Sequence, residues 1–149
     1  MGVISDTHGL LRQEAAGALR GVEHILHAGD VGEAEILQRL RQIAPVTAVR
    51  GNIDQRGDCG RLPATKRLEL GGKRIYMLHD RAELDLDPVA EGIAVVVSGH
   101  SHKPGIEWVK GVLYFNPGSA GPRRFSLPVS VGLLEISKSG IEPRLLTIG

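Results

Sequence analysis

The stretch GVISDTHG, residues 2–9, joins a short apolar run to a polar cluster and ends in glycine. The same order returns as HILHAGD over residues 24–30 and as VTAVRGNID over residues 46–54. Between these runs, the stretches 11–19 and 34–43 are amphipathic, and in the second one apolar residues recur at helical spacing. This alternation predicts a β-α-β-α-β unit, in which a parallel sheet is covered by crossover helices.

The second half of the chain has the pattern of strands and turns. Residues 51–63 are rich in glycine, aspartate and proline, which predicts a functional loop. The pair Gly71-Gly72 between two alternating runs predicts a hairpin, followed by a short helix or coil. The expected segments are the hairpin strands 66–70 and 73–78, the helix or coil 81–90, and strands 93–97, 105–110, 112–115, 129–136 and 141–148. Pro143 predicts that the last strand lies at a sheet edge.

The composition excludes several classes of protein. A length of 149 residues predicts a single domain over 1–149, and 42% hydrophobic residues exclude a disordered chain. The net charge of +1 argues against stable nucleic-acid binding and against a membrane-surface protein. Cys59 is the only cysteine, which excludes an intrachain disulfide and a cysteine zinc site. No apolar run is long enough to span a membrane, so we expect a cytoplasmic protein.

Polar clusters follow five of the predicted strands, at the end where open α/β sheets place their ligand sites. Residues i and i+2 of an extended segment point the same way, so Asp6 with His8, and His100 with His102, are expected to face one point each. Glycines precede several of these residues and allow close approach of the backbone. The candidate metal ligands are Asp6, His8, Asp30, Asn52, His79, His100 and His102. Their nitrogen and oxygen donors suit manganese, iron, zinc, cobalt or nickel.

Seven ligands are too many for one ion, whereas two ions about 3.5 to 4 Å apart would use all of them. Asp30 is the expected bridge because it stands between the other clusters in chain order. Two divalent ions, two aspartates and a bridging hydroxide leave a local charge of about +1. This charge predicts an anionic substrate such as a phosphate ester, without any overall basicity of the chain.

The ordered motifs Asp6-Thr7-His8, Gly29-Asp30, Gly51-Asn52, His79 and Gly99-His100-Ser101-His102 resemble those of the calcineurin-like metallophosphoesterases, particularly the small phosphodiesterases of the YfcE type. The segment from Asn116 to Arg123 also resembles this small branch. The resemblance implies an α/β fold, a four-layer α/β/β/α sandwich with two mixed sheets. It also implies two ion sites and attack on phosphorus by a metal-bridging hydroxide. Metal one would be held by Asp6, His8, Asp30 and His102, and metal two by Asp30, Asn52, His79 and His100.

The catalytic residues implied are Asn52, His27 and Asp54. Asn52 would serve as a ligand and as a hydrogen-bond donor to the substrate. His27 would orient Asp30 or the hydroxide, or else be a hydrogen-bonded structural residue. Many relatives carry histidine after the Gly-Asn pair as a general acid, whereas this chain has Ile53; Asp54, acting through a water, is the nearest replacement.

The sequence allows two roles for each of two arginines. Arg81 either contacts phosphate or pairs with Asp80, and Arg123 either clamps the substrate or is solvated or at an interface. The leading hypothesis is a phosphodiesterase for small phosphodiesters that uses two divalent ions, with manganese expected first and nickel, iron, cobalt or zinc as alternatives. The competing hypothesis is a non-catalytic metal-binding scaffold of the same fold, like the similar retromer subunit of eukaryotes. Self-association is left open.

Overall fold

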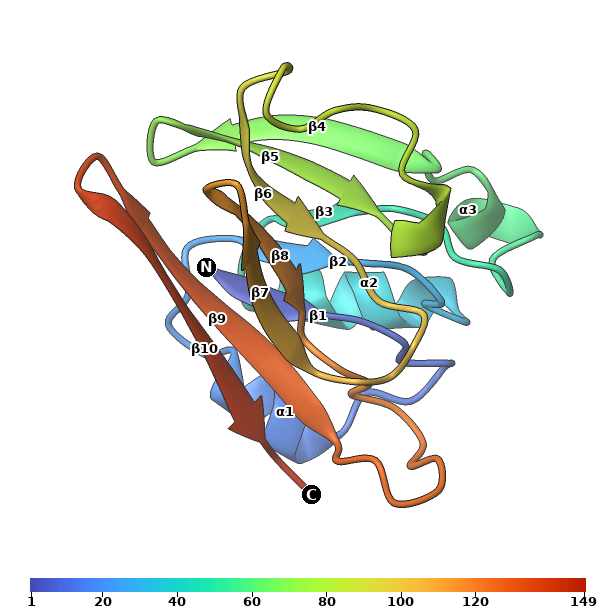
Figure 1. Ribbon diagram of the computed structural model, residues 1–149. Helices are drawn as coiled ribbons and strands as arrows, with labels where there is room; N and C mark the ends of the chain where they lie inside the picture. Colours follow the sequence, from blue (N-terminus) through green and yellow to red (C-terminus); the bar gives the residue numbers. More distant parts are fainter.

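The computed structural model describes residues 1–149 and contains two five-stranded sheets stacked face to face (Figure 1). The strand order is β10-β9-β1-β2-β3 in the first sheet and β4-β5-β6-β8-β7 in the second. The elements are β1 (Gly2–Ile4), α1 (Gln13–Ala18), β2 (Ile25–His27), α2 (Ala34–Arg41), β3 (Val46–Ala48), α3 (Gly57–Gly60), β4 (Thr65–Leu70), β5 (Lys73–Leu78), η1 (Arg81–Glu83), β6 (Ile93–Val97), β7 (Gly105–Val109), β8 (Val112–Asn116), β9 (Ser130–Ser137) and β10 (Gly140–Thr147).

The first sheet is built on the predicted β-α-β-α-β unit. Strands β1, β2 and β3 are parallel, and β9 and β10 extend the sheet in antiparallel fashion. Side chains alternate across it: Val3 and Leu26 face the second sheet, while Ile4 and Ile25 pack with the helices α1 and α2. The strand with Pro143 lies at the edge of the sheet, as predicted.

The second sheet begins with the predicted hairpin. Leu70 pairs with Lys73, so Gly71-Gly72 forms a two-residue turn with both φ angles positive. Leu68 of β4 and Ile75 of β5 face the first sheet, where they join the core between the sheets. The sheet is mixed because β5, β6 and β8 are parallel, whereas β4 and β7 are antiparallel to their neighbours.

The two outer layers differ in thickness. Helices α1 and α2 cover the outer face of the first sheet, with Leu37 and Leu40 buried in that core. The outer face of the second sheet carries only the single turn η1 and the coil after it, from which Leu84 and Leu86 pack against the apolar cluster that contains Tyr76. The expected four-layer arrangement of two mixed sheets is confirmed, with one α layer reduced to that turn. None of the helices is long and apolar enough to cross a membrane.

The carboxyl ends of β1, β2, β5 and β6 point to the same side of the molecule (Figure 1). Backbone hydrogen bonds join the segments that follow them: Asp6 N–H donates to Gly29 at 3.0 Å, and Gly99 N–H donates to His79 at 2.9 Å. The stacking of the sheets therefore gathers polar clusters from both halves of the sequence at one edge.

Candidate metal centre

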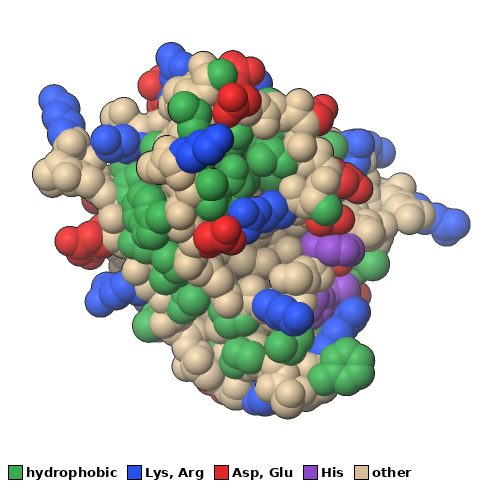
Figure 2. Space-filling view, viewed as in Figure 1, with side chains coloured by type: hydrophobic (Ala, Val, Ile, Leu, Met, Phe, Trp, Pro, Cys, Tyr) green, Lys and Arg blue, Asp and Glu red, His purple; other side chains and the backbone are tan.

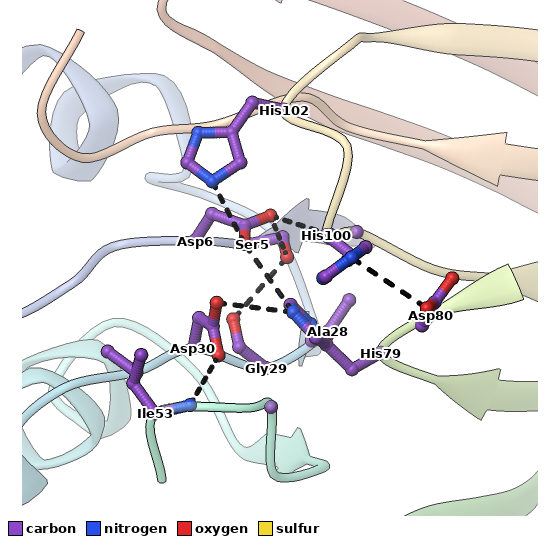
Figure 3. A network of polar contacts seen from close by, with 12 residues as sticks. Ser5, Asp6, Ala28, Gly29, Asp30, Ile53, His79, Asp80, His100 and His102 are labelled. Carbon is purple, nitrogen blue, oxygen red and sulfur yellow. Dashed lines mark hydrogen bonds and ion pairs between the residues drawn. The ribbon is translucent and has the colours of Figure 1, made fainter. Parts of the chain in front are cut away.

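Two aspartates at this edge each use one carboxylate oxygen to hold the scaffold and leave the other free. Oδ2 of Asp6 accepts from Ser5 Oγ at 2.8 Å and from the His100 backbone N–H at 3.1 Å. Oδ1 of Asp30 accepts from the Ile53 backbone N–H at 3.1 Å. The remaining oxygens, Asp6 Oδ1 and Asp30 Oδ2, face a group of histidines (Figure 3). The backbone thus fixes the direction in which each aspartate offers its second oxygen.

Three histidines turn ring nitrogens toward these free oxygens. Asp6 Oδ1 lies 3.8 Å from His8 Nε2, 3.7 Å from His79 Nε2 and 3.5 Å from His102 Nε2. Nδ1 of His79 donates to the Ala28 carbonyl at 2.7 Å, so Nε2 is the nitrogen available to a ligand. A backbone carbonyl in this position is a common partner of a metal-binding histidine.

Several buried atoms of this cluster have no hydrogen-bond partner: Asp6 Oδ1, His8 Nε2, His79 Nε2 and His102 Nδ1. The contact of 3.2 Å between His79 Nε2 and Asp30 Oδ2 is close but not aligned as a hydrogen bond. Unpartnered buried polar atoms are costly, and divalent cations bind nitrogen and oxygen atoms arranged in this way. The residues present therefore fit a metal ion.

The ligand atoms form two groups, one of Asp6, His8 and His102 and one of Asp6, Asp30 and His79. Asp6 belongs to both groups. Asp30 Oδ2 also faces both, at 3.5 Å from His8 Nε2 and 3.2 Å from His79 Nε2. The division into two groups matches what two neighbouring ions require, and the bridging role of Asp30 stays a prediction.

The backbone at the ligands is left-handed and not extended. The prediction that residues i and i+2 point the same way assumed an extended backbone, so that assumption was wrong. Positive φ angles occur at five ligand candidates: Asp6 (56°), His8 (46°), Asp30 (54°), His100 (69°) and His102 (62°). Such angles are strained for residues other than glycine and cluster at functional sites. Asp6 and His8 still converge, but His100 and His102 diverge: the His102 ring lies 5.3 Å from that of His8, and the His100 ring 5.2 Å from that of His79.

Two ligand candidates lie at the rim. The side chain of His100 is 42% exposed, and its Nε2 is 3.7 Å from Asp80 Oδ2. Asn52 is exposed and lines, with His79 and Asp80, a cavity of about 460 Å³. Both therefore stand beside the group that contains His79, the group to which the family resemblance assigned them.

The electrostatics of the cluster follow from burial and from the close pairs. Burial raises the pKa of Asp6, against the effect of the nearby histidines. Burial also disfavours the charged form of Asp30, but contacts with His79 and the Ile53 N–H outweigh it and lower the pKa of Asp30 to about 2. Burial works against protonation of His79, yet Asp30 and the Ala28 carbonyl raise its pKa. Because protons compete for the same atoms, metal affinity falls at low pH.

His27 is fully buried beneath the cluster and has no ring nitrogen free for Asp30. Nδ1 accepts from the Gly29 N–H at 3.1 Å, so Nε2 carries the proton and donates to Thr7 Oγ1 at 3.0 Å. Thr7 Oγ1 in turn donates to the Val31 carbonyl at 2.8 Å. Burial lowers the pKa of His27 to about 3, so the ring is neutral. This chain of hydrogen bonds connects the loop after β1 to the loop after β2. It is the geometry of a hydrogen-bonded structural residue, the second of the two roles considered for His27.

Asp54 is also buried, with 3% of its surface exposed, and its carboxylate is occupied by backbone donors. Oδ2 accepts from Val31 at 3.1 Å and from Gly51 at 2.9 Å, and Oδ1 accepts from Gly32 at 3.0 Å. The carboxylate thus connects the loop after β2 with the loop after β3. It has this anchoring geometry instead of the open position expected of a proton donor that acts through a water.

The structure gives Arg81 an ion-pair partner and leaves Arg123 without one. Arg81 pairs with Glu107 at 2.7 Å instead of Asp80 and lies 4.0 Å above the Tyr114 ring. This pair lines a cleft of about 480 Å³ that His100 borders. Arg123 is exposed and forms no ion pair.

Sequence reasoning did not identify three supporting contacts. Ser5 Oγ orients the Asp6 carboxylate, Asn116 Nδ2 donates to the Gly99 carbonyl at 3.0 Å, and Ser119 Oγ donates to the Asp6 carbonyl at 3.1 Å. The partners of Asn116 and Ser119 are distant in sequence, and the available signals were the polar ends of β1 and β8 and the family resemblance of the segment that begins at Asn116.

Comparison with known proteins supports the same chemistry. Residues 1–139 match the family described as Calcineurin-like phosphoesterase superfamily domain. A probable metallophosphoesterase of Methanothermobacter thermautotrophicus is 32% identical over 100% of this chain and 92% of its own. The phosphodiesterase YfcE of Escherichia coli K12 is 30% identical over 88% of this chain and 84% of its own.

Solved structures share the fold at lower identity. A novel archaeal phosphodiesterase superposes with a TM-score of 0.80 at 22% identity, covering 97% of this chain and 98% of its own. Vps29 of Entamoeba histolytica in complex with zinc superposes with a TM-score of 0.76 at 23% identity, covering 100% of both chains. At this level of identity these two likenesses establish the fold alone.

Proposed function

This chain belongs to the calcineurin-like phosphoesterase superfamily and is a metal-dependent phosphoester hydrolase, and we propose that it hydrolyses small phosphodiesters with two divalent ions. The observation that carries the proposal is the convergence of three unpartnered buried ligand atoms, Asp6 Oδ1, His8 Nε2 and His79 Nε2, which His102 Nε2 joins at 3.5 Å from Asp6 Oδ1. These residues come from both sheets, so the fold itself assembles the site.

The proposed ligands combine the two groups of the structure with the family resemblance, which shares Asp30 between the ions. Asp6, His8 and His102, with the facing oxygen of Asp30, hold one ion. Asp30 and His79, completed by the rim residues Asn52 and His100, hold the other. We expect manganese first; the nitrogen and oxygen donors also accept nickel, iron, cobalt and zinc.

When bound, two such ions lower the pKa of a water that can attack phosphorus and neutralise charge on the phosphoryl oxygens. The chain's own residues position the reactants. Asn52, exposed at the rim, offers its amide N–H to a phosphoryl oxygen. The hydrogen bonds of Ser5, Ile53 and Ala28 hold the carboxylates and His79 in fixed directions before substrate arrives. Such preorganisation is a main source of rate enhancement in charged transition states.

The preference for diesters rests on Ile53 and Asp54. Ile53 is 47% exposed at the rim, so an apolar side chain occupies the position after Asn52. The Asp54 carboxylate is held by backbone N–H groups. With no proton donor at either position, substrates whose leaving groups need no protonation are favoured. Comparison of kcat/KM on matched monoesters and diesters with one leaving group tests this preference.

The function is tested with bis(p-nitrophenyl) phosphate and added Mn²⁺, before and after chelation. We expect turnover that chelation abolishes, and a loss of at least about 100-fold in His8→Ala. His24→Ala is the matched control, because His24 bonds to Thr47 at the opposite end of the strands. Metal analysis of the purified protein identifies the resident ions. Equal activity in His8→Ala and His24→Ala would refute the assigned site.

The competing function is a metal-binding scaffold without catalysis. It predicts tight binding of a divalent ion with no turnover of any phosphodiester, with Mn²⁺, Ni²⁺, Co²⁺, Zn²⁺ or Fe²⁺ present. Turnover that depends on His8 rejects it.

A further inference from the structure

The loop Gly121–Leu127 rises directly from the rim of the metal centre. Its base is fixed at Gly121, where a Cβ would collide with the Asp6 and Thr7 carbonyls and whose own carbonyl accepts from Arg12 Nε at 3.0 Å. Its ends are joined where Ser130 N–H donates to the Ser119 carbonyl at 2.9 Å. A loop with joined ends and a fixed base presents its tip at a constant place beside the site.

The tip of this loop contains an unusual backbone angle. Seven residues other than glycine have positive φ, and five of them are ligand candidates. The sixth, Lys110, precedes Gly111 in the two-residue turn between β7 and β8, where positive φ is required. The seventh is Phe125, with φ of 52°, in the turn closed by Leu127 N–H and the Arg124 carbonyl. A bulky aromatic residue in this conformation is strained, and no hairpin register demands it.

Phe125 is also 94% exposed, the most of any large hydrophobic side chain in the chain. Its ring gains nothing from packing within the protein, while its backbone is strained. A single exposed apolar residue is common on protein surfaces, but strain and full exposure together are not explained by folding. Contact with a molecule outside the chain explains both.

The charge around Phe125 identifies the kind of molecule. Arg123 and Arg124 precede it, and the sequence has no acidic residue between Glu107 and Glu135. Neither arginine forms an ion pair. Arg124 follows Gly121 by three residues, which span at most about 11 Å, so its long side chain can reach the metal centre from the fixed base of the loop. Figure 2 shows Lys and Arg side chains beside the histidines exposed on this face.

We propose that Arg124 and Phe125 bind the organic arm of the substrate, and that this arm is a nucleoside: Arg124 contacts the phosphoryl group held at the metal centre, and Phe125 stacks on the base. The proposal rests on the proposed function. Phe125 follows Gly121 by four residues, which span at most about 14 Å, so the ring stays within reach of a nucleotide whose phosphate is at the ligands. One ring suits one base, whereas single-strand binding uses successive aromatic residues. The substrate class is therefore a diester of a single nucleotide.

The test compares two diesters with the same leaving group, methyl p-nitrophenyl phosphate and the p-nitrophenyl ester of adenosine 5′-monophosphate. In the wild type, kcat/KM is expected to be at least about 10-fold higher for the adenosine ester, the usual effect of one stacked base. Phe125→Asn should lose this preference while hydrolysing the methyl ester normally, because asparagine tolerates positive φ and removes only the ring. Phe125→Trp should keep it. Arg124→Gln should lower kcat/KM for both esters, and Arg39→Gln, on the exposed face of α2, for neither.

Binding and assembly are measured on the same variants. Calorimetry of the Mn²⁺-loaded protein should show that adenosine 5′-monophosphate binds about 10-fold more weakly to Phe125→Asn than to the wild type. If the wild type hydrolyses neither ester, the proposed function is wrong, and the calorimetry still decides the role of the loop. Equal loss on both esters, together with a change of sedimentation coefficient in Phe125→Asn, would show that the loop contacts a second copy of the chain. That result, or an unchanged preference in Phe125→Asn, overturns the proposal.

Discussion

Replacement of Asp54 by asparagine distinguishes the anchoring role that the structure supports from the proton-donor role that the sequence predicted. The carboxylate accepts three backbone N–H bonds, from Val31, Gly32 and Gly51, within a buried setting. An asparagine fits the same space, but its NH₂ group cannot accept a hydrogen bond. If the asparagine oxygen takes the place of Oδ2, the variant keeps the hydrogen bonds from Val31 and Gly51 but loses the charge that strengthened them. Its NH₂ group then faces the Gly32 N–H, and two donors cannot form a hydrogen bond.

The free energy of unfolding should fall by about 3 kcal/mol, because one charge-assisted bond is lost and one buried donor is left unsatisfied. Asp58→Asn is the matched control. Its side chain is 70% exposed and pairs with Arg61 at 2.8 Å, so the change should cost less than about 1 kcal/mol. Asp54→Asn should also weaken metal affinity by about 10-fold, because the loops that carry Asp30 and Asn52 are no longer tied together.

Urea unfolding of the metal-free protein, with chelator present, measures the first effect, and titration with Mn²⁺ measures the second. The anchoring role would be refuted by a stability equal to that of Asp58→Asn. Selective loss of kcat on diesters with basic leaving groups, at unchanged stability, would instead establish Asp54 as the proton donor.

Two further changes test other parts of the scaffold. The pKa of His27 is about 3 in the folded protein against 6.5 when unfolded, so the unfolded state binds the proton more strongly. Its contribution to stability should therefore fall by about 1.4 kcal/mol for each pH unit between pH 6 and pH 4. The difference in unfolding free energy between wild type and His27→Gln across this range should reveal this slope. A Cβ at Gly51 would collide with Asp30 Oδ1 and the Asp30 backbone nitrogen, so Gly51→Ala should reduce Mn²⁺ affinity by at least about 10-fold. Gly17→Ala, a helical site with open space, should leave Mn²⁺ affinity unchanged and raise stability by about 0.5–1 kcal/mol, as thermal unfolding will show.

The fold was predictable where periodicity repeats along the chain. Apolar runs alternating with amphipathic stretches indicated β1 to β3 with α1 and α2, and the glycine pair indicated the hairpin of β4 and β5. The thin outer layer over the second sheet was not predictable, because residues 81–90 are too short a window to separate a helix from coil. Tertiary packing of Leu84 and Leu86 decides that segment.

The candidate site was predictable in its members but not in its geometry. Polar residues at strand ends indicated which side chains gather, and the structure brings Asp6, His8, Asp30, His79 and His102 together. The divergence of His100 from His102 depends on left-handed backbone angles, which residue types alone do not specify. The partner of Arg81 lies 26 positions away on β7, beyond any local pattern.

The left-handed angles at five ligand candidates have a consequence for anyone who would transplant this centre into another protein. Copying seven side chains onto the strand ends of a new scaffold would leave them aimed in the wrong directions. The graft has to carry the loops themselves, with glycines such as Gly51 and Gly99 that let neighbouring side chains approach, and with buried acceptors such as Asp54 that hold the turns. A graft therefore has to transfer the backbone conformations of the loops together with the ligand side chains.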